Sequence, residues 1–177
     1  METLIKIRNV VQDSWQLLEP GADGALPAVP PEGDVIVPLT LWQRERASLL
    51  ARSGRLGVRL DSSEGPEALA GDLRHFDVIA VNFPKFTDGR GYSTARLLRD
   101  RYGYRGEIRA VGDVQRDQLL YLSRCGFDAF ALKERRDPQA ALAAFSDFSE
   151  AYQASVERPL PLFRRRFSSA PDGMESS

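Results

Sequence analysis

The chain has 177 residues, of which 42% are hydrophobic and 28% are charged, and its formal net charge is -1. This length and composition predict one globular domain with a substantial core, because two full domains would be cramped. A nearly neutral chain creates no broad electrostatic field, so we expect no nucleic-acid partner. One cysteine and one histidine exclude an internal disulfide, a cysteine-ligated cluster and a zinc site with several histidines.

Residues 1–33 are expected to form little regular structure before the main domain. Residues 3–11 mix apolar, β-branched and basic positions, which predicts a short edge strand or β-ribbon. Residues 19–33 are rich in proline and glycine and predict an extended linker, so 1–33 form an N-terminal strand and linker. The chain has neither a signal-peptide h-region nor an apolar run near the roughly 20 residues of a membrane span. We therefore expect a cytoplasmic protein without a membrane partner.

An α/β domain is expected over residues 34–156. Apolar, β-branched runs predict strands at 35–39, 56–60, 78–83, 107–111 and 127–132. Amphipathic patterns predict helices at 42–52, 66–73, 93–102, 116–125 and 138–152. Alternation at this pace predicts about five βα units and a mostly parallel sheet, either a TIM-like half-barrel or an open doubly wound sheet. Open strand edges in a half-barrel would favour a homodimer. Residues 157–177 are predicted to be a disordered tail, and its basic run at 163–167 is interpreted as solvated.

The loop after the strand at 78–83 is the best candidate for a site. Pro84 ends that strand because proline cannot donate to a sheet ladder, while Gly89 and Gly91 permit close backbone approaches. Ligands of α/β folds bind beyond the carboxyl ends of the strands. In this region the sequence concentrates ionisable and hydroxyl side chains, and the suspected ligand-binding residues are Lys85, Asp88, Arg90, Tyr92, Ser93 and Asp113.

Three uses of this rim remain open from the residues alone. Lys85 and Arg90, together with free amides at a helix start, would bind an oxyanion. Carboxylates from separate strand ends would suit magnesium, although we assign no metal; these are Asp61, Asp88 and Asp113. The third interpretation is that the aspartates cap helices and pair with neighbouring cations. The loop has neither a dinucleotide nor a P-loop fingerprint, so the residues leave the cofactor unknown.

Three further residues are interpreted as structural. Cys125 stands before a helix-ending glycine and is typical of a buried small hydrophobic residue. His75 is expected in the turn before the strand at 78–83, and Trp42 at a strand-to-helix junction is expected in the core.

A family resemblance covers roughly residues 34 to 150. It rests on the string Phe83-Pro84-Lys85-Phe86-Thr87-Asp88-Gly89-Arg90-Gly91-Tyr92-Ser93, on residues 106–114 and on Gly126-Phe127-Asp128-Ala129-Phe130. In these positions the chain resembles a bacterial family, domain of unknown function 934, commonly labelled a probable oxidoreductase of sulfite reduction. The resemblance implies a role beside assimilatory sulfite reductase in making sulfide for cysteine.

We therefore expect an accessory or oxidoreductase-associated protein of assimilatory sulfite reduction, with sulfite reductase as its partner. The alternative is an enzyme that binds a small oxyanion or phosphate on the C-terminal rim of the sheet. The residues leave open whether the chain is catalytic, because nothing in them carries electrons.

Overall fold

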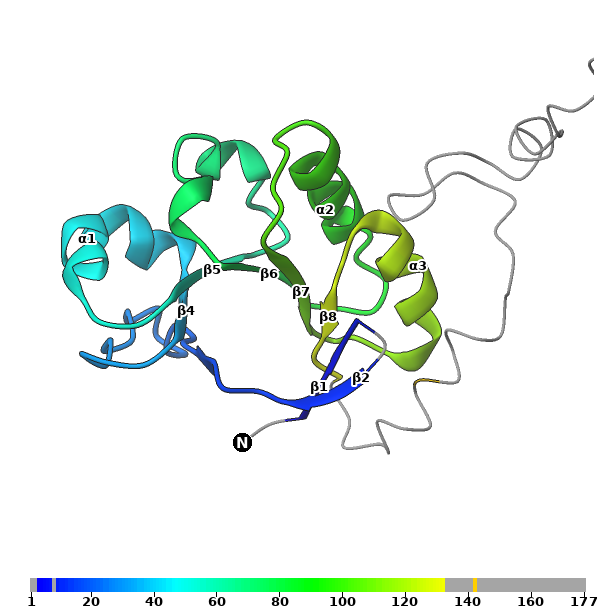
Figure 1. Cartoon of the computed structure of the whole chain (residues 1–177), viewed down its shortest axis with the longest axis horizontal. Helices are drawn as coiled ribbons and strands as arrows, with labels where there is room; N and C mark the ends of the chain where they lie inside the picture. The colour runs from blue at the N-terminus through cyan, green and yellow to red at the C-terminus, as the bar shows by residue number, and fades with distance from the viewer. Residues whose placement is uncertain (1–2, 8, 133–141, 143–177) are drawn as a thin grey trace, which may run out of the picture.

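A computed structural model describes residues 3–7, 9–132 and 142. Within these residues one sheet of eight strands curls into a half-barrel, in the order β2-β1-β8-β7-β6-β5-β4-β3 (Figure 1). The strands are β1 Thr3–Lys6, β2 Asn9–Gln12, β3 Gln16–Leu17, β4 Val35–Pro38, β5 Leu56–Leu60, β6 Val78–Phe83, β7 Glu107–Gly112 and β8 Ala129–Phe130.

The helices lie on the convex side of the sheet (Figure 1). They are α1 Leu39–Ala51, α2 Arg90–Asp100, α3 Leu119–Cys125 and the 3-10 segments η1 Pro66–Leu69, η2 Leu73–His75 and η3 Arg116–Gln118. None of the helices in the described part of the chain is both long and apolar enough to cross a membrane.

The mixed α/β class and the half-barrel are confirmed, but a clear series of five βα units is not. Strands β3 to β8 run parallel, whereas β1 pairs antiparallel with both β2 and β8. Between β5 and β6 the predicted helix is replaced by η1 and η2, because Gly71 interrupts the helical pattern. The predicted strand at 127–132 shortens to two residues, and β1 and β2 pair as the predicted β-ribbon.

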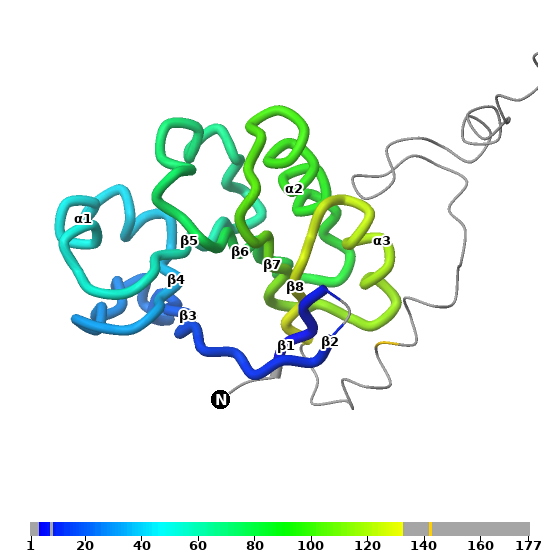
Figure 2. Tube along the Cα trace, in the orientation of Figure 1, coloured from blue at the N-terminus to red at the C-terminus, as the bar shows by residue number. Residues whose placement is uncertain are grey.

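The N-terminal segment joins the same sheet and covers its concave side. From β2 the chain passes across the open side of the curl to β3, which pairs with β4 (Figure 2). We call residues 13–19 the strap. Its Trp15 and Leu17 pack against a small apolar cluster on the concave face, made of Ile36, Val78, Ala80 and Val111. The strap therefore buries a surface that parallel strands alone would leave open.

The strap also changes the argument for a homodimer. That expectation assumed bare strand edges, but β1 pairs with β8 and so covers that end of the parallel sheet. The edges of the sheet are β2 and β3, which are short and are joined by only three residues of chain. Short edge strands offer little ladder to a second copy. The homodimer stays a prediction, which light scattering of the purified chain would check.

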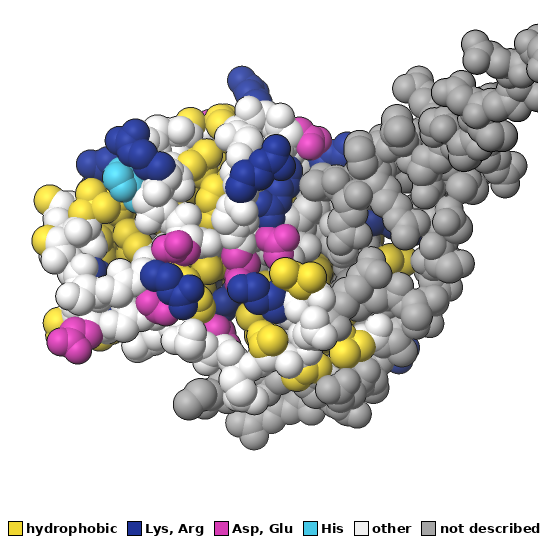
Figure 3. All heavy atoms as spheres, viewed as in Figure 1, with side chains coloured by type: hydrophobic (Ala, Val, Ile, Leu, Met, Phe, Trp, Pro, Cys, Tyr) yellow, Lys and Arg dark blue, Asp and Glu magenta, His cyan; other side chains and the backbone are white. Residues whose placement is uncertain are grey.

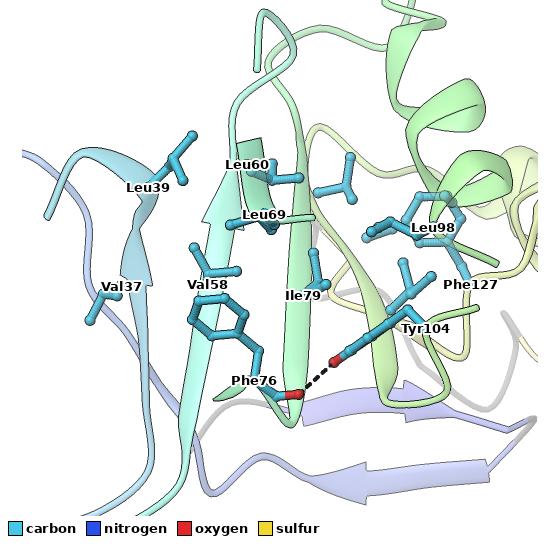
Figure 4. Packing of buried hydrophobic residues seen from close by; sticks show 14 of the residues in the cluster. Val37, Leu39, Val58, Leu60, Leu69, Phe76, Ile79, Leu98, Tyr104 and Phe127 are labelled. Atoms are coloured by element: carbon cyan, nitrogen blue, oxygen red, sulfur yellow. Dashed lines mark hydrogen bonds between the residues drawn. The ribbon is translucent and has the colours of Figure 1, made fainter. Parts of the chain in front are cut away.

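The main core lies between the convex face of the sheet and the helices (Figure 4). Helix α2 contributes Gly91, Thr94, Ala95 and Leu98, whose spacing places them on one face of a helix. Inside this core the Tyr104 hydroxyl donates to the Phe76 carbonyl at 3.1 Å. Burial raises the pKa of Tyr104, so the phenol stays a neutral hydrogen-bond donor.

Arg99 fastens the end of α2 to the sheet. Its Nε donates to the Gly126 carbonyl at 3.0 Å, and its Nη1 donates to the carbonyls of Tyr104 at 2.7 Å and Gly106 at 2.8 Å. Its Nη2 pairs with the Asp128 carboxylate. Burial nevertheless raises the pKa of Asp128, because desolvation outweighs the pairing with Arg99. One side chain thus satisfies three loop carbonyls and one buried acid.

The Arg99→Ala substitution should lower the free energy of unfolding by about 3 kcal/mol, because it leaves a partly buried carboxylate and three carbonyls unpaired. Urea denaturation followed by circular dichroism measures this loss. The matched control is Arg96→Ala on the same helix. Arg96 pairs with Asp100 at 2.6 Å on the exposed side, and its loss should cost less than about 0.5 kcal/mol. Similar losses for the two variants would contradict the role assigned to Arg99.

Two predicted elements lie outside the described residues: the last helix at 138–152, apart from Leu142, and the tail at 157–177. Leu142 packs against the main core.

Candidate functional site: the rim loop between β6 and α2

The loop between β6 and α2 leaves the sheet at Pro84 and enters the helix at Arg90. The geometry of this junction requires a glycine at position 91. A Cβ atom there would lie 2.6 Å from the ring of Phe83, so the helix could not approach the strand so closely. Because the first turn of α2 packs closely against the end of β6, the residues between them project from the rim of the sheet.

Arg90 and Asp88 form the central contact of this loop. Arg90 Nε donates to Asp88 Oδ1 at 3.0 Å, and Arg90 Nη2 donates to Asp88 Oδ2 at 2.6 Å. The same Nη2 donates to Ser62 Oγ at 3.0 Å, which ties this loop to the one that follows β5. We call Arg90, Asp88 and Ser62 the rim latch. It supports the interpretation of ion pairing and capping, since Asp88 Oδ1 also accepts the backbone N–H of Arg90 at 3.2 Å.

The rim latch holds Asp88 in its charged form. Hydrogen bonds from the Arg90 side chain and backbone hold the pKa of Asp88 well below its ordinary value, and the pKa of Arg90 is raised in return. The two charges therefore neutralise each other. In the middle of the face shown in Figure 3, acidic and basic side chains likewise lie next to one another.

Asp113 supports the loop from the neighbouring strand end. Gly112 turns the chain with a φ of 90°, and a Cβ atom there would lie 2.5 Å from the Phe83 carbonyl oxygen. The turn lets the Asp113 N–H donate to that carbonyl at 2.7 Å. Asp113 Oδ2 accepts the N–H of Phe86 at 3.2 Å. Asp113 thus positions the backbone of the loop.

Tyr92 is anchored from η3 and is partly buried. Gln118 Nε2 donates to the Tyr92 hydroxyl at 2.9 Å and contacts the Phe86 carbonyl at 3.4 Å. Partial burial raises the pKa of Tyr92, so the phenol stays protonated. Of the remaining predicted residues, Lys85 and Ser93 are exposed, and their side chains form no hydrogen bond or ion pair with other described residues. The structure brings the six predicted residues to one region, but four of them are engaged with their neighbours.

Exposed aromatic side chains on this face escaped the sequence analysis. Phe86 is 44% exposed at the tip of the loop, and Tyr121 is 56% exposed on α3. Tyr121 stacks on Tyr92 with ring centroids 5.0 Å apart. The signal available in the sequence was an aromatic residue among polar neighbours in the loop, since apolar residues in a helix such as α3 are usually assigned to its buried face.

The three carboxylates proposed for magnesium are engaged separately. Asp61 Oδ1 accepts Arg59 Nη2 and Asn82 Nδ2, each at 2.8 Å. Asp88 belongs to the rim latch, and Asp113 holds the loop backbone. Among the residues that the structure describes, no three His, Cys, Asp or Glu side chains are grouped to hold a metal ion.

His75, Cys125 and Trp42 occupy separate places. Trp42 is buried, as expected, and its indole N–H donates to Asp72 at 3.0 Å. His75 lies in η2, where Arg46 Nη2 approaches its Nε2 at 3.4 Å. Cys125 is buried in α3, and burial raises the pKa of its thiol, which favours the unreactive protonated form.

A curled, mostly parallel α/β sheet with an ordered loop on its C-terminal rim defines the structural class of this chain. The chain belongs to the family described as bacterial protein of unknown function (DUF934), whose model matches residues 57–163. The match includes the rim loop and both of its neighbouring strand ends. The comparison with curated proteins found no match.

The Asp88→Asn substitution should remove an acid-dependent contribution to stability. A carboxyl whose folded pKa lies below its unfolded value of about 3.9 stabilises the fold above that pH and loses this effect as the pH falls. The stability difference between wild type and Asp88→Asn should therefore be constant near neutral pH and shrink as the pH falls through about 4. Urea denaturation across a pH series measures it.

Ser62→Ala is the comparison for this series, because it removes one hydrogen bond of the rim latch without removing a charge. Ser62 also helps to hold the pKa of Asp88 low, so the effect of Ser62→Ala should vary with pH in the same direction as that of Asp88→Asn, but by a smaller amount. A pH-independent difference for Asp88→Asn would show that Arg90 does not bias the protonation of Asp88.

Proposed function

We propose that this chain is an accessory protein of assimilatory sulfite reduction that binds sulfite reductase through its rim face. We define the rim face as residues 85–93 with Tyr121. The observation that carries this proposal is the contrast between its charged and its aromatic side chains. Arg90 and Asp88 neutralise each other, while Phe86 and Tyr121 expose large apolar surfaces.

That contrast favours a protein partner. Exposed aromatic residues supply much of the binding energy at protein interfaces, and a loop held by internal hydrogen bonds loses little entropy when it binds. The rim latch, Gln118 and Asp113 all restrain this loop before any partner arrives. The face is therefore preorganised for association.

The choice of sulfite reductase rests on the resemblance of the string at 83–93 to the family labelled for sulfite reduction. An accessory role also suits the chemistry of the chain. Burial keeps the Cys125 thiol protonated, so the redox steps would be performed by the reductase and its cofactors.

A second candidate is an enzyme that binds a small oxyanion or phosphate on the same rim. The observation in its favour is Lys85, an exposed cation without an ion-pair partner among the described residues. Lys85 lies beside the first turn of α2, whose N–H groups favour anions. The two candidates make different predictions for the same face.

Combined Phe86→Ala and Tyr121→Ala substitutions should weaken binding to sulfite reductase by roughly 10- to 100-fold, because each removes a large side chain from the contact. Biolayer interferometry with immobilised reductase measures the Kd. Leu50→Ala is the matched control: Leu50 is 43% exposed on α1, away from the rim face, and its loss should leave the Kd unchanged. Circular dichroism confirms that the variants fold.

The reverse pattern would support the second candidate. An unchanged Kd for the aromatic double variant would refute the rim face as the contact surface. Loss of phosphate or sulfite binding in Lys85→Ala, with the reductase complex intact, would assign the rim to a small anion.

A further inference from the structure

The concave face of the sheet carries a row of cations at one level. Strand pairing places Arg59 opposite Ala80, Ala80 opposite Arg109, Arg109 opposite Ala129, and Ala129 opposite Lys6. Three cationic side chains therefore alternate with two alanines, and neighbouring cations stand about 10 Å apart, which is two strand spacings. Because alanine has no charged or polar side chain, each cation can pair only with residues at other levels of the sheet or on the strap.

Two of these cations are fully paired. Arg109 donates to Asp13 on the strap at 2.6 Å and to Glu107 at 2.8 Å, and its side chain is only 4% exposed. Lys6 pairs with Glu107 at 2.7 Å. The ion pairs of Arg109 and Lys6 therefore cover the end of the concave face where the parallel strands begin.

Arg59 is paired much less completely. Its Nη2 donates to Asp61 at 2.8 Å, but its Nη1 lies 3.7 Å from Glu19, whose side chain is 65% exposed. Its Nε is buried and has no hydrogen-bond partner among the residues that the structure describes. The flanking residues at the same level, Pro38 and Ala80, have no side-chain acceptor. Since the Arg59 side chain is 11% exposed, bulk solvent reaches it poorly.

From this arrangement we infer that Arg59 binds a small oxyanion, on the concave face one residue below the rim. A buried guanidinium N–H without an acceptor is costly, and an anionic oxygen is the acceptor that repays this cost best. The planar fork of arginine suits sulfate, phosphate and carboxylate groups alike. The anion would accept from Nε, on the edge of the guanidinium that Nε shares with Nη2, so it would lie beside the Asp61 carboxylate, while Glu19 stays near Nη1.

The electrostatic surroundings allow only a compact ligand. Asp61 and Glu19 face Arg59, and Glu64 also interacts electrostatically with it, so the bound anion meets three carboxylates that stay in place. Asn82 reduces the repulsion, because its Nδ2 donates to the same Asp61 oxygen as Arg59 does. This site does not depend on the proposed contact with sulfite reductase, since it involves no residue of the rim face.

The test is an NMR titration of the full-length wild-type chain that follows the Nε–H signals of arginine. Sodium sulfate, sodium phosphate and sodium acetate are compared with sodium chloride at equal ionic strength. We expect the Arg59 Nε–H signal to shift saturably with at least one oxyanion and not with chloride. Comparing the shifts caused by sulfate and phosphate with the shift caused by acetate then distinguishes a tetrahedral ligand from a carboxylate. The internal control is Arg55, whose Nε already donates to Asp34 at 3.0 Å and should not move.

A pair of variants gives a second measurement. Arg59→Lys keeps the charge but loses the planar fork, so its anion affinity should fall at least tenfold in a thermal-shift titration. Arg105→Gln removes an exposed cation that no described residue contacts, and its titration should match wild type. An Arg59 signal that responds to no oxyanion, or equally to chloride, overturns the inference, and so does an Arg59→Lys titration that matches wild type. Binding to sulfite reductase is read separately, so the two proposals can fail independently.

Discussion

The parallel register of β4 to β8 is the constraint on which the rest of this structure depends. Because these strands point the same way, the residues that follow them all emerge at one rim, although Asp61 and Asp113 are 52 positions apart in the chain. Asp61, Arg90 and Asp113 become neighbours for this reason alone. The same register decides which side chains share a level on the concave face, and so creates the row that contains Arg59 and Arg109.

The two faces of the sheet differ in composition and in what covers them. The convex face is covered by helices and is apolar, as burial on that side demands. The concave face carries charged residues beside a small apolar cluster, and the strap covers it with Trp15, Leu17 and the mostly buried acid Asp13. Buried ion pairs do little for net stability, but they define where the strap must lie, because each charge needs its own partner.

Several features of the site were predictable from the residues and others were not. Pro84 marked the end of β6 and Gly91 was expected to permit a close backbone approach, but the helix was predicted to begin at 93, whereas α2 begins at Arg90. The loop after β6 was recognised as the rim. The pairing of Arg90 with Asp88 was one of three open interpretations, because spacing alone cannot say whether two charges face each other or face a ligand. The exposure of Phe86 and Tyr121 was missed, since apolar residues near or within helices are ordinarily assigned to the core.

By itself, the sequence determined the α/β class, the buried strands at β4 to β7 and the position of the candidate loop. Those features depend on hydrophobic periodicity and on proline and glycine, which act over a few residues. The folded chain was needed to show that residues 13–19 cross the concave face, that Ser62 completes the rim latch, and that the Nε of Arg59 is buried without an acceptor in the described part of the chain. These depend on strand register between distant segments, which no local pattern encodes.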